Sequence, residues 1–226
     1  MTEAIVSGVE LVDVFAEDGA DTGWLMQHLR AHGLDTQISV WRVATGVLSK
    51  VGSVVTSQGL AAIAKIPDLV PAAGSSGSVY DFVVELVAVS DPGNAGTIVR
   101  SAVAAGAQAI VFGPNSVDPW NPKALRASAG AVFKVPVLQD PQVCAGVPTE
   151  RMGADPHKGE VCDEVDFTGP VTLVVGNEAH GLDGQAASGI DRWVSIPMLG
   201  AVESMNVATA TAVLCYEIAR QRRAVS

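Results

Sequence analysis

Phe82-Val-Val-Glu-Leu-Val-Ala-Val89, which Ser90 joins to the turn Asp91-Pro-Gly-Asn94, decides the fold of this 226-residue chain. Eight residues with a single charge, at Glu85, predict a strand that is buried on both faces. The turn is followed by a helical pattern from about Ala95 to Ala105. A buried strand that leads through a turn into a helix is the unit from which parallel α/β sheets are built.

The same alternation continues to the end of the chain. Apolar runs predict strands, and longer periodic segments predict helices. The expected strands are 109–112, 135–138, 171–175 and 193–197, the expected helices are 122–129 and 206–222, and residues 140–166 form an irregular acidic stretch. This pattern predicts an α/β domain over residues 80–226, with a mostly parallel sheet that is covered on both faces.

A smaller module precedes this domain. Strands are predicted at 9–15, 36–40 and 60–66, with a helix from Asp21 to His32. We therefore expect a small α/β module over residues 1–70. Residues 71–79 are rich in Gly and Ser and predict a linker between the two domains.

Composition excludes several classes of protein. Hydrophobic residues make up 48% of the chain and charged residues 17%, unlike a disordered chain. No apolar run approaches the roughly 18 residues of a membrane span. The three cysteines lack zinc-ligand spacing, so we expect no metal site, and reduced thiols in a cytoplasmic protein.

The charge balance is acidic but uneven. The net charge is −10, which argues against a nucleic-acid partner because phosphate binding usually needs basic residues. The segment 100–134 reverses this balance, with one acid, Asp118, against four bases: Arg100, Lys123, Arg126 and Lys134. A basic strip of this kind keeps an RNA partner open.

Polar residues gather after three of the predicted strands, where parallel sheets bind ligands. After the first strand, Gly93 and Gly96 are interpreted as allowing a tight turn into the helix. Asn94 and Arg100 follow there, and one reading places both on a single cleft, where the guanidinium would bind phosphate. Their spacing alone favours the alternative, a helix cap at Asn94 and a solvent-exposed Arg100.

The second segment is Val175-Gly-Asn-Glu-Ala-His-Gly-Leu182. Gly176 ends a strand and would let a ligand approach the backbone closely. Glu178 would accept hydrogen bonds from a ribose or orient an arginine. His180 is either a general base or an ordinary surface residue.

The third segment, Ile196-Pro-Met-Leu-Gly-Ala-Val-Glu-Ser-Met-Asn-Val207, leads into the last helix. Ser204 or Asn206 would cap that helix, but a cap alone does not require the whole block. No GxGxxG or GxxxxGK[ST] motif is present, which argues against a classical dinucleotide fold, and so against a Rossmann oxidoreductase, and against a P-loop.

In this order, the three segments resemble the motifs of the SpoU/TrmH family of SPOUT RNA methyltransferases. The first family motif, Asn-x-Gly with an Arg six residues after the Asn, matches Asn94, Gly96 and Arg100. The second, a strand ending in Gly-x-Glu with a later glycine, matches Gly176, Glu178 and Gly181. The third matches Ile196–Gly200 and Ser204–Val207, with Met205 in place of the usual Leu. The resemblance covers about residues 80–223.

The resemblance implies a SPOUT-like fold with a C-terminal trefoil knot. It also implies a homodimer whose active site uses both subunits. The reaction would be methyl transfer from S-adenosyl-L-methionine to a ribose 2′-OH of rRNA or tRNA. The implied catalytic residues are Arg100, Asn94, Glu178, Ser204 and Asn206. The implied cofactor-binding residues are Gly176, Asn177, Ile196, Met198 and Met205.

One feature departs from the family pattern. Relatives with an N-terminal RNA-recognition module usually begin with a further strand and helix, so we expect the module at 1–70 to be N-terminally short. The alternative function is a dimeric cofactor- or RNA-binding protein of the same fold that lacks turnover.

Overall fold

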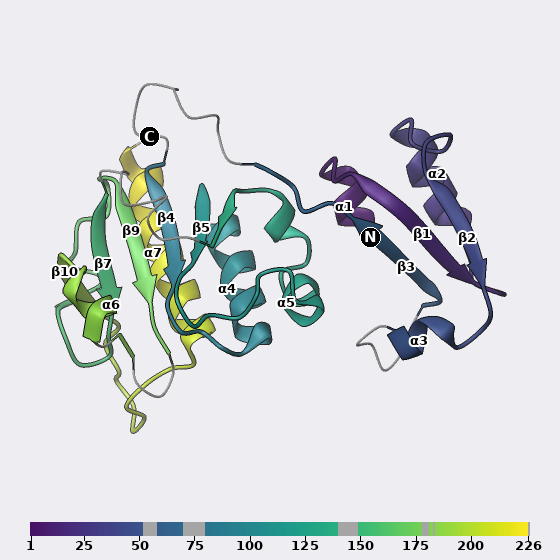
Figure 1. The fold of residues 1–226 in the computed structure, drawn as a ribbon. Helices are drawn as coiled ribbons and strands as arrows, with labels where there is room; N and C mark the ends of the chain where they lie inside the picture. Colours follow the sequence, from purple (N-terminus) through teal and green to yellow (C-terminus); the bar gives the residue numbers. More distant parts are fainter. Residues whose placement is uncertain (52–57, 70–79, 140–148, 178–180, 183, 226) are drawn as a thin grey trace. The chain divides into compact units, whose positions relative to one another are not determined.

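The computed structural model describes residues 1–51, 58–69, 80–139, 149–177, 181–182 and 184–225 (Figure 1). The chain divides into two compact units, Met1–Asp68 and Leu69–Ser226. The predicted linker at 71–79 lies outside the described residues. Within the described part of the chain, no helix is both long and apolar enough to cross a membrane.

The smaller unit has a three-stranded sheet. Its elements are α1 (Thr2–Val6), β1 (Leu11–Glu17), α2 (Gly23–Ala31), β2 (Ser39–Val43), α3 (Val47–Val51) and β3 (Leu60–Ala64). The strand order is β2-β1-β3, with β1 parallel to β2 and antiparallel to β3. Helices α1 and α2 bury Ile5, Leu25 and Leu29 against Val14 of the central strand. The predicted helix and three strands are present, and α1 and α3 are additions.

The larger unit contains a seven-stranded sheet. Its strands are β4 (Phe82–Leu86), β5 (Ala109–Phe112), β6 (Val137–Leu138), β7 (Glu150–Ala154), β8 (Glu160–Val161), β9 (Val171–Val175) and β10 (Arg192–Ser195). Their order is β6-β5-β4-β9-β7-β10-β8, and every pairing between them is parallel. The predicted mostly parallel α/β sheet is confirmed.

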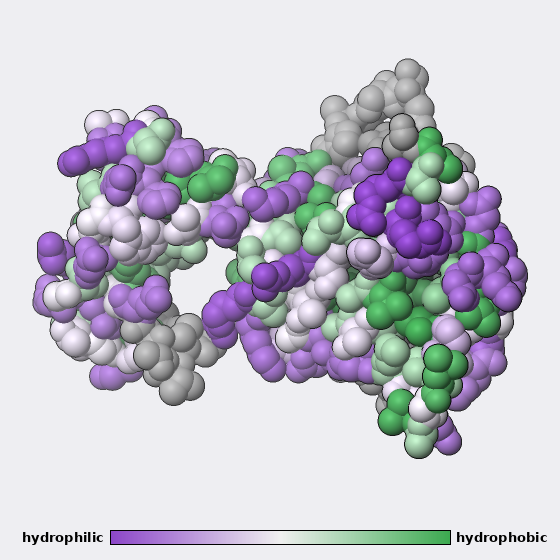
Figure 2. Space-filling view, turned by 180° about the vertical axis from the view of Figure 1, so that it is seen from behind, coloured by the Kyte–Doolittle hydropathy of each residue, from purple (hydrophilic) through white to green (hydrophobic). Residues whose placement is uncertain are grey.

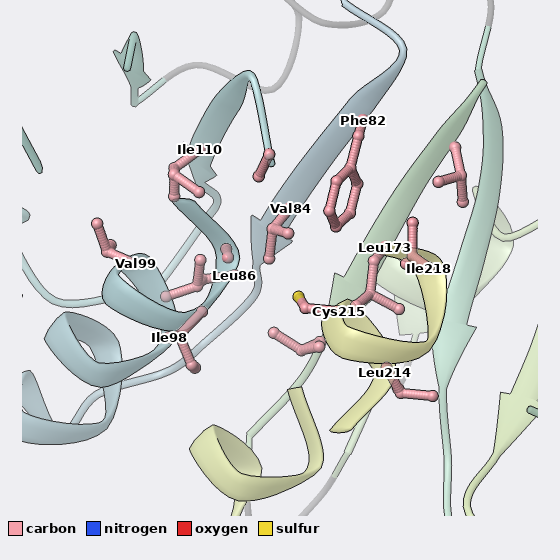
Figure 3. Packing of buried hydrophobic residues seen from close by; sticks show 14 of the residues in the cluster. Phe82, Val84, Leu86, Ile98, Val99, Ile110, Leu173, Leu214, Cys215 and Ile218 are labelled. Carbon is pink, nitrogen blue, oxygen red and sulfur yellow. The ribbon is translucent and has the colours of Figure 1, made fainter. Parts of the chain in front are cut away.

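Helices pack on this sheet through apolar side chains. They are α4 (Pro92–Ala104), α5 (Pro122–Ala127), α6 (Gly184–Ser188) and α7 (Val207–Val225), and a 3-10 turn spans Ala131–Phe133. Figure 3 shows side chains of α4 and α7 pointing at β4 and β9. Ile98 of α4 and Leu214 and Ile218 of α7 are buried in this core with Leu86 and Leu173.

Strand β7 corrects the prediction that residues 140–166 are irregular. It lies inside the sheet, between β9 and β10. Its sequence hides it because Arg151 and Gly153 interrupt the apolar pattern. The structure accommodates Arg151 through a 2.7 Å ion pair with the buried Glu85 of β4. A Cβ at Gly153 would lie 2.9 Å from the Trp193 ring of β10, so a glycine is needed where these side chains meet.

The first motif also needs a correction, because Gly93 and Gly96 lie within α4 and not in a turn before it. Asp91 is the N-cap, and its carboxylate accepts a hydrogen bond of 2.8 Å from the Asn94 backbone N–H. Gly96 is buried against α5, where a Cβ would collide with the Ala124 carbonyl oxygen and lie 2.6 Å from the Ala127 Cβ. Gly96 therefore permits close contact between two helices.

Candidate functional site

A cavity of about 340 Å³ opens beyond the carboxyl ends of β7, β9 and β10. This is the edge of a parallel sheet where ligands bind, and the volume lies in the usual range for a small-molecule site. Three loops form its wall: the loop after β7, the loop after β9, and the segment that joins β10 to α7. Its lining includes Ala154, Asp155, Pro156, His157, Gly176, Asn177, Gly181, Ile196, Met198, Glu203, Ser204, Met205 and Val207.

All five residues predicted to bind the cofactor line this cavity, and so does Ser204 of the predicted catalytic set. The loop after β9 returns on itself there, because the Gly181 N–H donates to the Asn177 carbonyl at 2.8 Å. The Asn177 side chain donates to the Ala88 carbonyl at 3.0 Å, which fixes the loop to the segment after β4.

The structure shows a second requirement for a glycine at Gly176, besides the predicted approach of a ligand to its backbone. A Cβ at this position would collide with the carbonyl oxygen of Gly181 and lie 2.8 Å from the Leu182 nitrogen. The missing side chain therefore makes room for the loop's own backbone. A glycine here shapes the cavity wall itself.

Asn94 and Asn206 are brought together although 112 residues separate them. The Asn206 side-chain amide donates to the Asn94 side-chain oxygen at 3.1 Å. The other end of the Asn206 amide caps α7, since its oxygen accepts from the Ala208 N–H at 2.9 Å. This bond joins the first motif to the third, beside the cavity-lining residues Met205 and Val207.

Arg100 lies apart from this group. Six residues along an α-helix correspond to about 600°, which leaves Asn94 and Arg100 roughly 120° apart around α4. Arg100 is exposed and does not line the cavity, and its side chain makes no hydrogen bond or ion pair with any other described residue. The reading that places Asn94 and Arg100 on one cleft is therefore not met within this single chain.

Glu178 and His180 lie outside the described residues. The role predicted for Glu178 stays a prediction. Among the residues that are described, no group of three or more His, Cys, Asp or Glu is arranged to hold a metal ion.

The sequence reasoning missed the loop after β7. Asp155 lines the cavity with a carboxylate that is 13% exposed. It accepts from the His157 N–H at 2.9 Å and pairs with the Lys158 ammonium at 3.3 Å. Lys158 in turn lies over the Trp193 ring, 4.7 Å from its centroid. The missed signal was Gly153-Ala-Asp-Pro-His157, a polar turn after a strand that had not been recognised.

The N-cap of α4, Asp91, carries a negative charge. The backbone N–H of Asn94 holds the pKa of Asp91 below its ordinary value, and Lys123 adds to this effect. Asp91 is thus an ionised helix cap that contacts the backbone of a predicted catalytic residue.

A parallel sheet whose strand-end loops form a small-molecule cavity agrees with the methyltransferase class that the three motifs predict. Residues 81–216 match the SpoU rRNA Methylase family, and the chain belongs to that family.

Two relatives have named substrates. The chain is 38% identical to the 23S rRNA (uridine(2479)-2′-O)-methyltransferase of Streptomyces viridochromogenes. This alignment of 146 residues covers 59% of this chain and 50% of that protein. It is 32% identical over 192 residues to the 23S rRNA (guanosine(2553)-2′-O)-methyltransferase RlmP of Bacillus subtilis, covering 82% of this chain and 74% of that protein. The first alignment thus spans half the length of the Streptomyces enzyme.

Solved structures extend the similarity to nearly the whole chain. The SpoU methyltransferase AviRb of Streptomyces viridochromogenes, in complex with AdoMet, has a TM-score of 0.82 and 28% identity, covering 98% of this chain and 87% of that chain. An RNA 2′-O ribose methyltransferase has a TM-score of 0.77 and 29% identity, with 98% and 85% coverage. The predicted family is confirmed.

Proposed function

We propose that this chain methylates a nucleotide of ribosomal RNA on its ribose 2′-hydroxyl. Family membership confirms the predicted reaction class and its cofactor, S-adenosyl-L-methionine. Ribosomal RNA is favoured over tRNA because the two relatives described above, at 38% and 32% identity, act on 23S rRNA. The observation that carries the proposal is the cavity, whose wall contains all five residues predicted to bind the cofactor.

The residues present fit this cofactor. The cavity has room for a small molecule, and Gly176 and Gly181 leave backbone groups at its wall uncovered by side chains. Gly176, Asn177, Ile196, Met198 and Met205 would hold the cofactor, which supplies an electrophilic methyl group when bound.

The chain's own residues then position the ribose. Asn206 holds the Asn94 side chain beside the cavity, and Ser204 offers a hydroxyl on the cavity wall. Arg100 would bind an RNA phosphate and stabilise the charge that develops on the 2′-oxygen. A guanidinium stays protonated at neutral pH, which favours this role over that of a general base.

The proposal includes a homodimer in which Arg100 works in the partner's site. The exposed position of Arg100, away from the cavity of its own chain, supports this arrangement. Hydrophobic side chains also gather on a protruding edge of the larger unit (Figure 2). Leu199, 98% exposed, and Val202 lie in the segment that joins β10 to α7. Tyr216 of α7 is separately 62% exposed. Exposed apolar surface of this kind marks an interface.

The trefoil knot and the RNA-binding role of residues 1–70 are also part of the proposal. Knots are rare in proteins, and this one is expected from the family. The place of action would be the cytoplasm, where ribosomal RNA is found and where the free, buried Cys162 and Cys215 stay reduced.

The test is transfer of a labelled methyl group from S-adenosylmethionine to ribosomal RNA from a strain that lacks this gene. We expect incorporation at one ribose, resistant to alkaline cleavage on its 3′ side. Cofactor binding without incorporation into any RNA would favour the alternative, a binding protein without turnover.

A further inference from the structure

Apart from Arg100, the basic strip of the sequence has no role in the site as described so far. Arg100, Lys123, Arg126 and Lys134 stand in a chain of net charge −10. The structure places Lys123 and Arg126 on α5, and both are exposed. Residues three apart on a helix share a face, so these two cations form one basic surface, the α5 face.

Gly96 brings the α5 face close to the site. A Cβ at Gly96 would lie 2.6 Å from the Ala127 Cβ and 2.9 Å from the Ser128 nitrogen, so α5 packs directly on the first turns of α4. The N-cap Asn121 fixes where α5 begins, by accepting from the Lys123 N–H at 2.9 Å. Lys123 is thereby carried to the N-terminus of α4.

A chain of contacts connects Lys123 to the cavity. Its ammonium lies 3.3 Å from the Asp91 carboxylate. Asp91 accepts from the backbone of Asn94, whose side chain accepts from Asn206. The two residues that flank Asn206 line the cavity. The α5 face therefore begins beside the residues that would position the ribose.

Stability does not account for Lys123. Its side chain is 59% exposed and that of Asp91 is 47% exposed. Ion pairs so open to water contribute little to folding. A cation held at the edge of the site is instead placed to bind the phosphates of an incoming RNA strand. The acidic surface of the rest of the chain would repel those phosphates.

We infer that the α5 face binds the RNA backbone next to the target nucleotide, with Lys123 and Arg126 each contacting phosphate. This inference rests on the proposed function, because it takes RNA as the substrate. It assigns α5 a positioning role: the helix fixes where the strand lies and leaves base recognition to other surfaces.

The test is the salt dependence of RNA binding by the full chain. The double variant Lys123→Gln/Arg126→Gln is compared with wild type, using protein-free 23S ribosomal RNA as the probe. The matched control is Arg220→Gln, which removes an exposed arginine, 53% accessible and paired with Glu217, from the far end of α7. Cofactor affinity is measured for each variant by calorimetry, as a check that the fold is intact.

We expect the double variant to bind this RNA on the order of tenfold more weakly at low salt. The slope of log affinity against log salt should become shallower by roughly one to two, as for the loss of two phosphate contacts. Cofactor affinity should match wild type, and Arg220→Gln should keep the wild-type slope. Lys123→Arg/Arg126→Lys, which keeps both charges, should restore most of the affinity.

Two results would overturn the inference. One is a wild-type salt slope in the double variant. The other is a loss of log affinity in Arg220→Gln at least half as large as in the double variant, which an effect of net charge alone would give because this control removes one charge instead of two. Failure of the proposed function looks different, because wild type would then bind RNA without transferring a methyl group. In either case, the RNA-binding measurements show whether the α5 face binds phosphate.

Discussion

At the scale of single residues, Asn206 performs two tasks with the two ends of one amide. Its oxygen caps α7 and its nitrogen holds Asn94. Asn206→Ser keeps a capping hydroxyl but loses the contact with Asn94, whereas Asn206→Ala loses both.

We therefore expect Asn206→Ala to lower the free energy of unfolding by about 1 kcal/mol, while Asn206→Ser stays near wild type. Methyl transfer should fall on the order of tenfold or more in both variants, because Asn94 is no longer held in position. Urea unfolding and single-turnover transfer measure the two effects. Full activity in Asn206→Ser would show that the bond to Asn94 is dispensable.

Gly176 gives a second prediction at this scale. Gly176→Ala should weaken S-adenosylmethionine binding by at least about tenfold, because the new Cβ displaces the Gly181 backbone from the cavity wall. Calorimetry measures the affinity, and circular dichroism should show an unchanged fold. Gly169→Ala, at a position outside the three motifs with nothing within 4 Å, is the control. Equal cofactor affinities for Gly176→Ala and wild type would show that this glycine is not required for cofactor binding.

At the scale of elements, the contact between α4 and α5 reverses an ordinary rule. Gly→Ala within a helix usually stabilises by roughly 0.5–1 kcal/mol. At Gly96 the added methyl group would meet the backbone of α5, so we expect Gly96→Ala to destabilise by about 1–3 kcal/mol. Gly169→Ala, with nothing within 4 Å, is the matched control in a urea titration. A higher free energy of unfolding for Gly96→Ala would mean that α5 can move away from the added methyl group without loss of stability.

The cap of α4 gives a prediction for acid conditions. The pKa of Asp91 is lowered in the folded chain, first by the Asn94 N–H and also by Lys123. The ionised cap therefore stabilises the fold above about pH 4, and this contribution is lost as the pH falls through the lowered pKa. Asn caps a helix without a charge, so the stability difference between wild type and Asp91→Asn should shrink between pH 6 and pH 3. A constant difference in urea unfolding across this range would contradict the lowered pKa.

The elements also show what the sequence can and cannot predict. Strands β4, β5 and β9 were predictable because each is apolar apart from at most one residue, Glu85 in β4 and Thr172 in β9, as expected inside a parallel sheet. Strand β7 was not, because Arg151 is accommodated by Glu85, which lies 66 residues earlier in the chain. A pattern within one segment cannot reveal such a partner. Asp155 at the cavity wall was missed in turn, because it lies in the turn that follows β7.

At the scale of the whole molecule, the site residues divide into two groups. Those on strand-end loops converge as predicted, because parallel strands end at one edge of the sheet. Arg100 does not join them, because the helical period turns it away from Asn94. Arg100→Ala should keep cofactor affinity within a few-fold and lose methyl transfer by on the order of 10²-fold. Equal losses of both, by calorimetry and transfer assay, would indicate a structural arginine.

Mixing two inactive variants tests whether the site is shared between subunits. If Arg100 acts in the partner's site, each active site of the dimer takes Arg100 from one subunit and Asn206 from the other. A heterodimer of Arg100→Ala with Asn206→Ala then has one active site with both residues intact and one with neither. Random exchange makes about half of the dimers mixed, so roughly a quarter of wild-type transfer should return on co-refolding. Mixing Arg100→Ala with the double variant Arg100→Ala/Asn206→Ala is the control, which should recover nothing. No recovery in the first mixture, with heterodimers verified by mass, would place Arg100 and Asn206 of one chain in the same site.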